Sequence, residues 1–203
     1  MFNRKVPHAR FIERQIEDVR AAAETNSLLS ALALSLTFPD VFGQVLFPDI
    51  VLRDGRRNAG VQYAKWFDEF VGAEYEAPEE PESSELKRYF TGKMCWKLRC
   101  AYLHEGKSDN DYPYEPSDSQ SNSEHEFEFE LALHACDAIG DMTESTAPDR
   151  IKRHVRIDIG KLCMCLCDAA EHCLRDNAEL FDESTSDVLD LPYMIRLFGM
   201  DDQ

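Results

Sequence analysis

The chain has 203 residues and a net charge of −17. This length fits one domain, 1–203, and the charge excludes a strongly basic nucleic-acid binder, because phosphate binding rests on Lys and Arg. The N-terminus MFNRKVPHARF lacks the apolar run of a secretory signal, and the longest apolar stretch, LLSALALSL, is far shorter than the roughly 18–20 residues that span a bilayer. We therefore expect a cytoplasmic protein that is not inserted in a membrane.

The acidic residues are unevenly distributed. Segments 74–85, 105–130 and 176–203 together carry −21, so the rest of the chain carries +4. Pro, Ser, Asn and Asp dominate much of the first two segments, and we expect acidic loops at about 74–85 and 105–124 and an acidic C-terminal tail at 176–203. The mildly basic remainder is compatible with an anionic ligand.

Four segments have the apolar spacing of amphipathic helices: 9–36, 61–71, 85–103 and 159–176. Ser84 and Asp158 are suitable N-caps for the last two of these helices. The segment 53–57 between the first two helices is rich in turn-forming residues and contains three arginines.

Two segments alternate strictly between apolar and polar residues, as strands with one buried face do. HEFEFELAL, 125–133, has glutamates on its polar face, and KRHVRIDI, 152–159, has basic residues there. Because opposite charges stabilise neighbouring strands, we predict that these two strands pair antiparallel, with His154 in an exposed charge ladder. The expected fold class is mainly α, a four- or five-helix bundle with a two-stranded antiparallel β-hairpin inserted before the last long helix.

The seven cysteines are odd in number and clustered, unlike a disulfide framework, and we expect reduced thiols. Cys163 and Cys167 would share a helical face, but two ligands do not complete a metal site, so we interpret them as buried hydrophobic residues. His134 and His172 fall in apolar or helical surroundings without a ligand partner at suitable spacing, and we interpret both as structural. We expect no metal and no cofactor.

The sequence RCAYLH places Arg99 and His104 near the end of a predicted helix. Cleavage of RNA without a metal requires a base for the ribose 2′-hydroxyl, an acid for the departing 5′-oxygen and a cation for the charge that develops on phosphorus. His can carry either proton near neutral pH, and Arg stays charged and matches a phosphate. Five positions of a regular helix separate the two residues by roughly 140°, so they converge only if the helix frays before His104 or the Arg99 side chain curls back. Gly106 favours a helix end here.

Arg, four residues and His at the end of a late helix in a helical body resembles the signature of the HEPN superfamily, the higher eukaryote and prokaryote nucleotide-binding domains. This resemblance implies a four- or five-helix bundle and a homodimer in which two such motifs form one composite cleft. Many members are metal-independent endoribonucleases of toxin–antitoxin, antiviral or RNA-processing systems, and others are binding or dimerisation modules. By this resemblance, Arg99 would bind phosphate and His104 would transfer protons.

Further residues near the motif are candidates for supporting roles. Active HEPN members usually have a polar residue directly after the Arg, where this chain has Cys100. Glu105 follows the His; it is a candidate to orient His104, although an acid at this position more commonly faces solvent. Trp96 and Tyr102 are candidates to stack on a base, although aromatic residues at such positions also form cores or dimer interfaces. Arg53, Arg56 and Arg57 are candidate phosphate contacts, although arginines in such a loop are also commonly solvated.

Three hypotheses follow. The first is a metal-independent ribonuclease that acts on RNA as a homodimer through Arg99 and His104. The second is a non-catalytic module that engages a cognate protein partner through acidic or apolar surfaces. The third is a nucleotide or small-anion binder in which Arg99 acts together with Arg53, Arg56 or Arg57. A structural alternative to all three is that Arg99 pairs with an acid of a neighbouring loop and His104 caps the helix.

Overall fold

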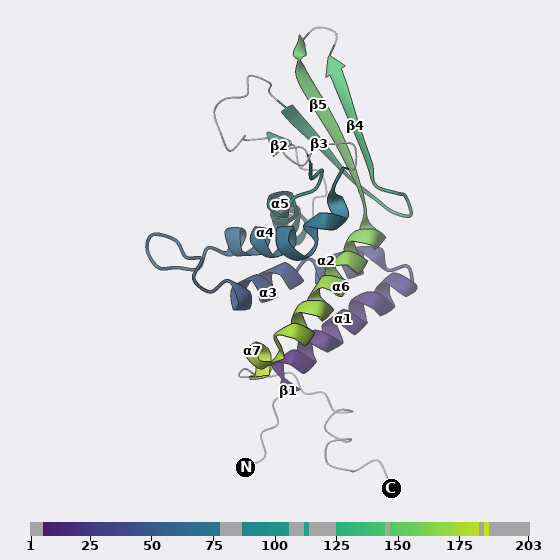
Figure 1. Ribbon diagram of the computed structural model, residues 1–203. Helices are drawn as coiled ribbons and strands as arrows, with labels where there is room; N and C mark the ends of the chain where they lie inside the picture. Colours follow the sequence, from purple (N-terminus) through teal and green to yellow (C-terminus); the bar gives the residue numbers. More distant parts are fainter. Residues whose placement is uncertain are drawn as a thin grey trace, which may run out of the picture.

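The periodic segments form helices in the computed structural model, which describes residues 6–77, 87–105, 112–113, 125–144, 147–182 and 185–186. The protein is mainly helical, with a small mixed β-sheet at one end of the helical body (Figure 1). The helices in the described residues are α1 (His8–Glu24), α2 (Leu28–Ser35), α3 (Phe38–Leu46), α4 (Ala59–Phe70), α5 (Gly92–Cys100), α6 (Ile159–Asp176) and α7 (Ala178–Asp182). Two short helical turns, η1 (Gly72–Tyr75) and η2 (Ala101–Glu105), follow α4 and α5. Most of the predicted acidic loops and tail lie outside the described residues.

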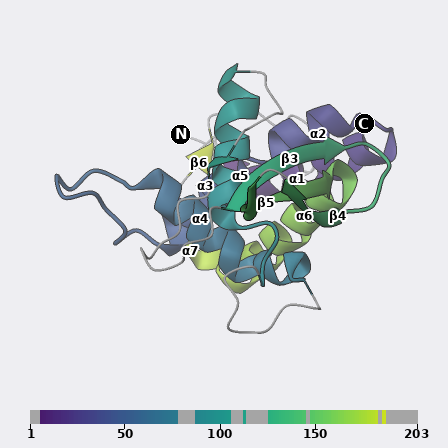
Figure 2. The ribbon, with the colours of Figure 1, turned by 90° about the horizontal axis from the view of Figure 1, so that it is seen from above.

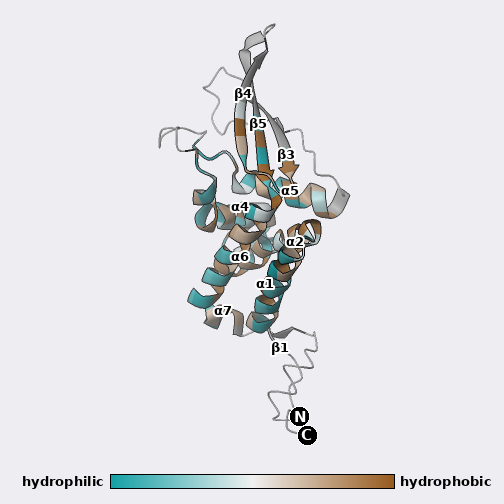
Figure 3. Ribbon diagram, turned by 90° about the vertical axis from the view of Figure 1, so that its right-hand side faces the viewer, coloured by the Kyte–Doolittle hydropathy of each residue, from teal (hydrophilic) through white to brown (hydrophobic). Residues whose placement is uncertain are grey.

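The helices α1 and α6 lie side by side, with α2 against the same helix α6 (Figure 1). Both long helices carry hydrophilic and hydrophobic faces (Figure 3), and the hydrophobic faces supply buried residues such as Ile16, Val19, Leu166 and Ala170. The predicted helix 159–176 is confirmed, and its cap is Asp158, whose Oδ1 accepts a hydrogen bond from the Lys161 amide at 2.7 Å.

The prediction of one helix over 9–36 is wrong, because the chain turns between α1 and α2. Asn26 adopts a left-handed conformation with φ of 62°, which Asn tolerates better than most residues. The Asn26 and Ser27 amides donate to the carbonyls of Ala23 and Ala22, so the turn uses the free carbonyls at the end of α1. The polar sequence of this turn lets α2 fold back against α6.

The segment Leu28–Leu46 is long and apolar enough to cross a bilayer by length and composition. In the structure it consists of two separate helices, α2 and α3, and half of it is buried inside the protein. It therefore does not indicate a membrane protein.

The aromatic spacing of α4 is confirmed as core. Tyr63, Trp66 and Phe67 are fully buried, and they pack between α3 and α5 and against Tyr75 and Phe90. Figure 2 shows these helices from above, with the turn 50–58 between α3 and α4 extending away from the body.

The helix α5 begins at Gly92, seven residues later than the sequence predicts. Its cap is Thr91, whose side chain accepts a hydrogen bond from the Met94 amide, whereas the predicted cap Ser84 lies outside the described residues. Tyr89 and Phe90 are instead buried in non-helical chain, where the Tyr89 amide donates to the Tyr75 carbonyl. Burial of two aromatic side chains therefore outweighs the helical propensity of this segment.

The sheet contains β2 (Tyr112–Pro113), β3 (His125–Ala132), β4 (Ala138–Glu144) and β5 (Ala147–Asp158) in the order β2-β3-β5-β4. A separate pair, β1 (Val6–Pro7) and β6 (Thr185–Ser186), lies at the opposite end of the protein. The two predicted strands pair, but they are parallel rather than antiparallel. The chain passes from β3 into β4, an unpredicted strand that forms the antiparallel hairpin with β5 directly before α6.

The predicted charge complementarity of β3 and β5 holds in the parallel register. Glutamates of β3 lie opposite basic residues of β5, in the pairs Glu126 with Lys152, Glu128 with His154, and Glu130 with Arg156. The Glu130 carboxylate lies 3.1 Å from His154 Nε2 and accepts a hydrogen bond from Arg156 Nε at 2.8 Å. The prediction that His154 lies in this ladder is confirmed.

A second polar cluster fixes the sheet to the helices. Asp137 accepts hydrogen bonds from the Asp158 amide (2.7 Å), the Lys161 ammonium (2.8 Å) and the Tyr89 hydroxyl (2.9 Å). Burial raises the pKa of Tyr89 to about 12, and the hydrogen bond to Asp137 adds to this shift. Because these residues come from the β3–β4 connection, β5, α6 and the segment before α5, the cluster determines where α5 lies.

Candidate functional site

Arg99 is placed by the last turn of α5. Cys95 and Leu98, both fully buried, hold this helix in the core, and Asp40 on α3 lies within hydrogen-bond distance of Arg99. Arg99 therefore faces α3, with its guanidinium 5.2 Å from the ring centroid of Trp96, three residues earlier on the same helix.

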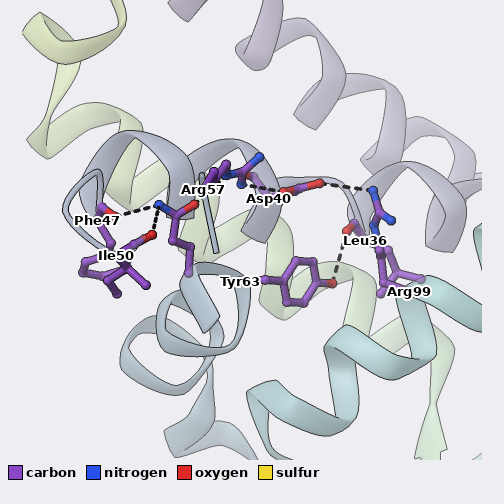
Figure 4. A network of polar contacts seen from close by, with 8 residues as sticks. Leu36, Asp40, Phe47, Ile50, Arg57, Tyr63 and Arg99 are labelled. Atoms are coloured by element: carbon purple, nitrogen blue, oxygen red, sulfur yellow. Dashed lines mark hydrogen bonds and ion pairs between the residues drawn. The ribbon is translucent and has the colours of Figure 1, made fainter. Parts of the chain in front are cut away.

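The carboxylate of Asp40, near the start of α3, binds two arginines at once (Figure 4). Its Oδ2 accepts a hydrogen bond from Arg99 Nη2 at 3.1 Å, and its Oδ1 accepts one from Arg57 Nη2 at 2.6 Å. The side chains of Arg99, Asp40 and Arg57 are 18%, 23% and 33% exposed. The negative charge of Asp40 thus lies between the two positive charges of Arg57 and Arg99 in a half-buried place.

Two buried polar residues of α4, Gln62 and Tyr63, lie near this group, and Gln62 contacts it directly. Gln62, 2% exposed, accepts a hydrogen bond from Arg57 Nε at 2.5 Å and donates to the carbonyls of Phe47 and Ile50. Tyr63 donates to the Leu36 carbonyl at 3.1 Å, and its hydroxyl lies 3.4 Å from Cys95 Sγ. Burial raises the pKa of Tyr63 well above its usual value and that of Cys95 to about 12, so both groups are neutral at physiological pH.

The helix changes its geometry between Arg99 and His104. The regular α-helix ends at Cys100, and residues Ala101–Glu105 form the π-helical turn η2. In a π-helical turn, hydrogen bonds join residues five apart, so such residues approach one another more closely than in an α-helix. The backbone of His104 lies in this turn, whereas the side chains of His104 and Glu105 lie outside the described part of the chain.

Tyr102 joins η2 to α2, since its hydroxyl donates to the Leu29 carbonyl at 3.0 Å. Cys100 is half-buried at the end of α5. Trp96 is also half-buried, packed beside Tyr63 with the ring centroids 5.2 Å apart.

The three candidate arginines of the turn 50–58 have separate surroundings. Arg57 belongs to the Asp40 cluster, but Arg53 and Arg56 are exposed in the turn. Arg56 Nε donates to Asp54 at 2.8 Å, an interaction between neighbours in solvent. The structure therefore brings together Arg99 and Arg57 and leaves Arg53 and Arg56 apart from them.

The remaining histidine and cysteine interpretations have mixed outcomes. Cys163 and Cys167 are buried in the core, as expected, and burial raises the pKa of both thiols, that of Cys167 to about 12. His134 is exposed rather than in apolar surroundings, whereas His172 lies on helix α6, as expected, where it is exposed and 3.2 Å from Asp176. Among the described residues, no group of three His, Cys, Asp or Glu side chains is arranged to hold a metal ion.

Asp40 and Gln62 were not found from the sequence. An acid in the first turn of a helix is ordinarily explained by the helix dipole, and nothing local connects Asp40 to an arginine 59 residues later. The alternative in which an acid pairs with Arg99 is correct, although the acid comes from α3 and not from a neighbouring loop.

Comparison of the chain with models of known protein families, with curated proteins and with solved structures finds no match. The features of the protein that indicate a function are therefore the Arg57–Asp40–Arg99 cluster and the π-helical turn that follows Arg99.

Proposed function

We propose that this protein is a HEPN-like, metal-independent endoribonuclease that acts as a homodimer in the cytoplasm. Arg99 binds the scissile phosphate and His104 transfers protons. The observation that carries the proposal is the pair of arginines bound to Asp40. One of them, Arg99, lies just before the π-helical turn that contains His104. π-Helical turns are rare in proteins, but those that occur are often found at functional sites.

The arginine pair supports phosphate binding by its charge and its fixed position. Guanidinium groups remain charged at any physiological pH and offer several donors to a phosphate. Asp40 and Gln62 hold these groups before any ligand binds, which reduces the entropy lost on binding.

In the proposed reaction, the ribose 2′-oxygen bonds to phosphorus as the bond from phosphorus to the 5′-oxygen breaks. His104 of one copy takes the proton of the 2′-hydroxyl, and His104 of the second copy donates a proton to the departing 5′-oxygen. The products are a 2′,3′-cyclic phosphate and a free 5′-hydroxyl. Arg99 stabilises the negative charge that develops on the phosphate oxygens.

Exposed apolar residues beside the motif support a homodimer. Leu29 on α2 is 53% exposed and Leu103 in η2 is 36% exposed, and Tyr102 links the two elements. An apolar surface at this place suits contact with a second copy, which would bring two motifs together.

The test is cleavage of a mixed-sequence single-stranded RNA in EDTA. Arg99→Ala and His104→Ala should each lower the rate at least about a hundredfold, the size expected for one acid–base or charge-stabilising group. Arg53→Ala and His172→Ala are matched controls, because they remove the same residue types from exposed positions apart from the cluster. Equal rates in all variants, or no cleavage by the wild type, would reject the proposal.

One observation favours a second candidate function, a non-catalytic module that binds RNA or a nucleotide. The Asp40 carboxylate already takes part of the Arg99 charge, and Cys100 stands where active HEPN members usually have a polar residue. Binding of RNA that needs Arg57 and Arg99, without any cleavage, would favour this function over the ribonuclease.

A further inference from the structure

A groove of about 750 Å³ lies between α4 and α5, on the Trp96 side of the arginine cluster. At one end of it, Gly60 faces the indole of Trp96, and a Cβ at Gly60 would lie 2.9 Å from Trp96 Nε1. Gly92 approaches Ala64 further along the groove, so the two helices stay close over its length. The absence of a side chain at Gly60 leaves room for the Trp96 ring in the groove, and its absence at Gly92 lets α5 approach α4 closely.

Trp96 connects the groove to the cluster. Its ring lies 5.2 Å from the Arg99 guanidinium and also lines the groove, where it is half-buried. The other tryptophan of the chain, Trp66, is fully buried. A ligand in the groove would therefore contact Trp96 without reaching Trp66.

Two lysines stand on opposite walls of the groove, Lys65 on α4 and Lys93 on α5, and both are exposed. Within the described part of the chain, neither lies within ion-pair distance of a carboxylate; Lys65 Nζ instead lies 4.2 Å from the Phe47 ring centroid. In a chain of net charge −17 this is uncommon, because most other basic residues with described side chains pair with acids: Arg10, Arg14, Arg20, Arg56, Arg57, Lys87, Arg88, Arg99, Arg156, Lys161 and Arg175.

The two acids of the groove lie at the end away from Trp96. Asp68 is occupied, since its Oδ1 accepts a hydrogen bond from the Gly92 amide at 2.7 Å and lies 3.8 Å from Arg88. Glu69 is exposed and lies within ion-pair distance of no base in the described residues. The groove thus runs from an aromatic end beside Arg99, past two lysines, to an acidic end.

We propose that this groove holds single-stranded RNA, with one base stacked on Trp96 and the adjoining phosphates beside Lys65 and Lys93. Aromatic platforms combined with basic walls bind single strands in this way, because every base has a face that stacks. This inference rests on the proposed function in that RNA is the ligand, and it adds the site that holds the strand next to the phosphate on Arg99. The strand leaves the groove before Glu69, which repels it.

The test uses binding of a short 2′-O-methyl oligouridine, which cannot be cleaved because its 2′-oxygen is blocked. Binding at low salt should quench the tryptophan fluorescence. Trp96→Phe, which leaves only Trp66, should abolish the quenching while the affinity measured by anisotropy stays within about threefold.

Lys65→Gln and Lys93→Gln should each raise Kd about three- to tenfold and lower the slope of log K against log salt by about 0.7. Glu69→Gln should lower Kd about twofold or more. Arg14→Gln on α1 is the matched control, since it removes an exposed charge elsewhere.

Failure of this site and failure of the proposed function give different results. Quenching through Trp96 and weaker binding of the lysine variants, without cleavage of RNA by the wild type, would support the groove and reject catalysis. Cleavage that depends on Arg99 and His104, with unchanged affinity in Lys65→Gln, Lys93→Gln and Glu69→Gln, would reject the groove and leave the function in place. Loss of affinity equally in Arg14→Gln would also reject the groove, because it would mean attraction by overall charge.

Discussion

Asp40 accepts hydrogen bonds from two guanidinium groups that come from different parts of the chain, Arg57 before α4 and Arg99 at the end of α5. A carboxylate in this place neutralises one of the two positive charges and fixes the position of both guanidinium groups. All three side chains are at most one-third exposed, so water compensates poorly for a lost partner.

Asp40→Asn should therefore destabilise the protein by about 2–3 kcal/mol, because both arginines would keep their charge and lose the charged acceptor that Asp40 provides. Urea unfolding followed by circular dichroism measures this change. Asp54→Asn serves as the control, because it removes the same group from the exposed pair with Arg56 and should leave the urea midpoint unchanged. Equal midpoints for the two variants would mean that the Asp40 pair contributes no more than a surface pair.

The buried thiols should make the protein sensitive to alkaline pH. Burial raises the pKa of Cys95 and Cys167 to about 12 and that of Cys165 and Cys173 to about 11. A raised pKa means that the unfolded chain loses these protons first, so the stability is complete below the ordinary thiol pKa, near 9, and is lost as the pH rises toward 11–12.

We expect the free energy of unfolding to be flat to about pH 8 and then to fall by about 1.4 kcal/mol per pH unit for each thiol that ionises only in the unfolded chain. Urea unfolding in reductant at about pH 7, 9 and 10 measures the slope. Cys167→Ala should reduce this slope by the contribution of one thiol. A free energy that stays constant to about pH 10 would contradict the burial of these groups.

The site and the groove both depend on the contact between helices α4 and α5. Gly92 begins α5, and a Cβ there would lie 2.1 Å from the backbone oxygen of Ala64, inside the closest real contacts. Replacing a glycine by alanine in a helix is ordinarily favourable by up to about 1 kcal/mol. Here the clash is with backbone and cannot be relieved by a side-chain rotation, so it outweighs that gain.

Gly92→Ala should destabilise the protein by about 2 kcal/mol, in the range of overpacking in a dense core, and move α5 away from α4. The midpoint of thermal or urea unfolding measures this loss. Gly140→Ala on β4 is the matched control, because nothing lies within 4 Å of its added Cβ, and it should change little. If both variants behaved alike, the close approach of the two helices would be wrong.

At the level of the whole protein, the proposed dimer predicts that the protein sediments with the mass of two chains. It also predicts a surface at which charged substitutions would separate the two copies. The apolar residues Leu29 and Leu103 are exposed beside the motif, and a second copy bound there would cover them. The acidic residues that give the chain its charge of −17 oppose self-association in general, so only a specific apolar contact would form a dimer.

We expect the wild type to sediment as a dimer and the double variant Leu29→Glu, Leu103→Glu to sediment as a monomer with its RNA cleavage lost. Leu180→Glu on α7 is the control, since Leu180 is 49% exposed but lies away from the motif (Figure 1), and it should remain a dimer. A wild type that cleaves RNA as a monomer would reject the composite cleft.

Much of the secondary structure follows from local sequence. Helix α4, helix α6 with its Asp158 cap and strand β3 are predicted close to their true limits, because apolar periodicity and capping act over a few neighbouring residues. Strand β5 is also predicted, but it begins at Ala147, before the predicted start at Lys152. The charges of β3 and β5 also predict that these strands are neighbours. Within the site, the sequence alone indicates Arg99, Trp96 and Arg57 as candidates.

Other features depend on contacts between distant residues. Strand direction is one, because the alternating charges of β3 and β5 match in either direction, and it is β4 on the far side of β5 that makes them parallel. The late start of α5 is another, since Tyr89 and Phe90 gain more from burial than from helix formation. Asp40 joins Arg57 and Arg99 across 17 and 59 residues, a distance over which no local pattern acts, and so the cluster at the centre of the proposed site exists only through the packing of α3, α4 and α5.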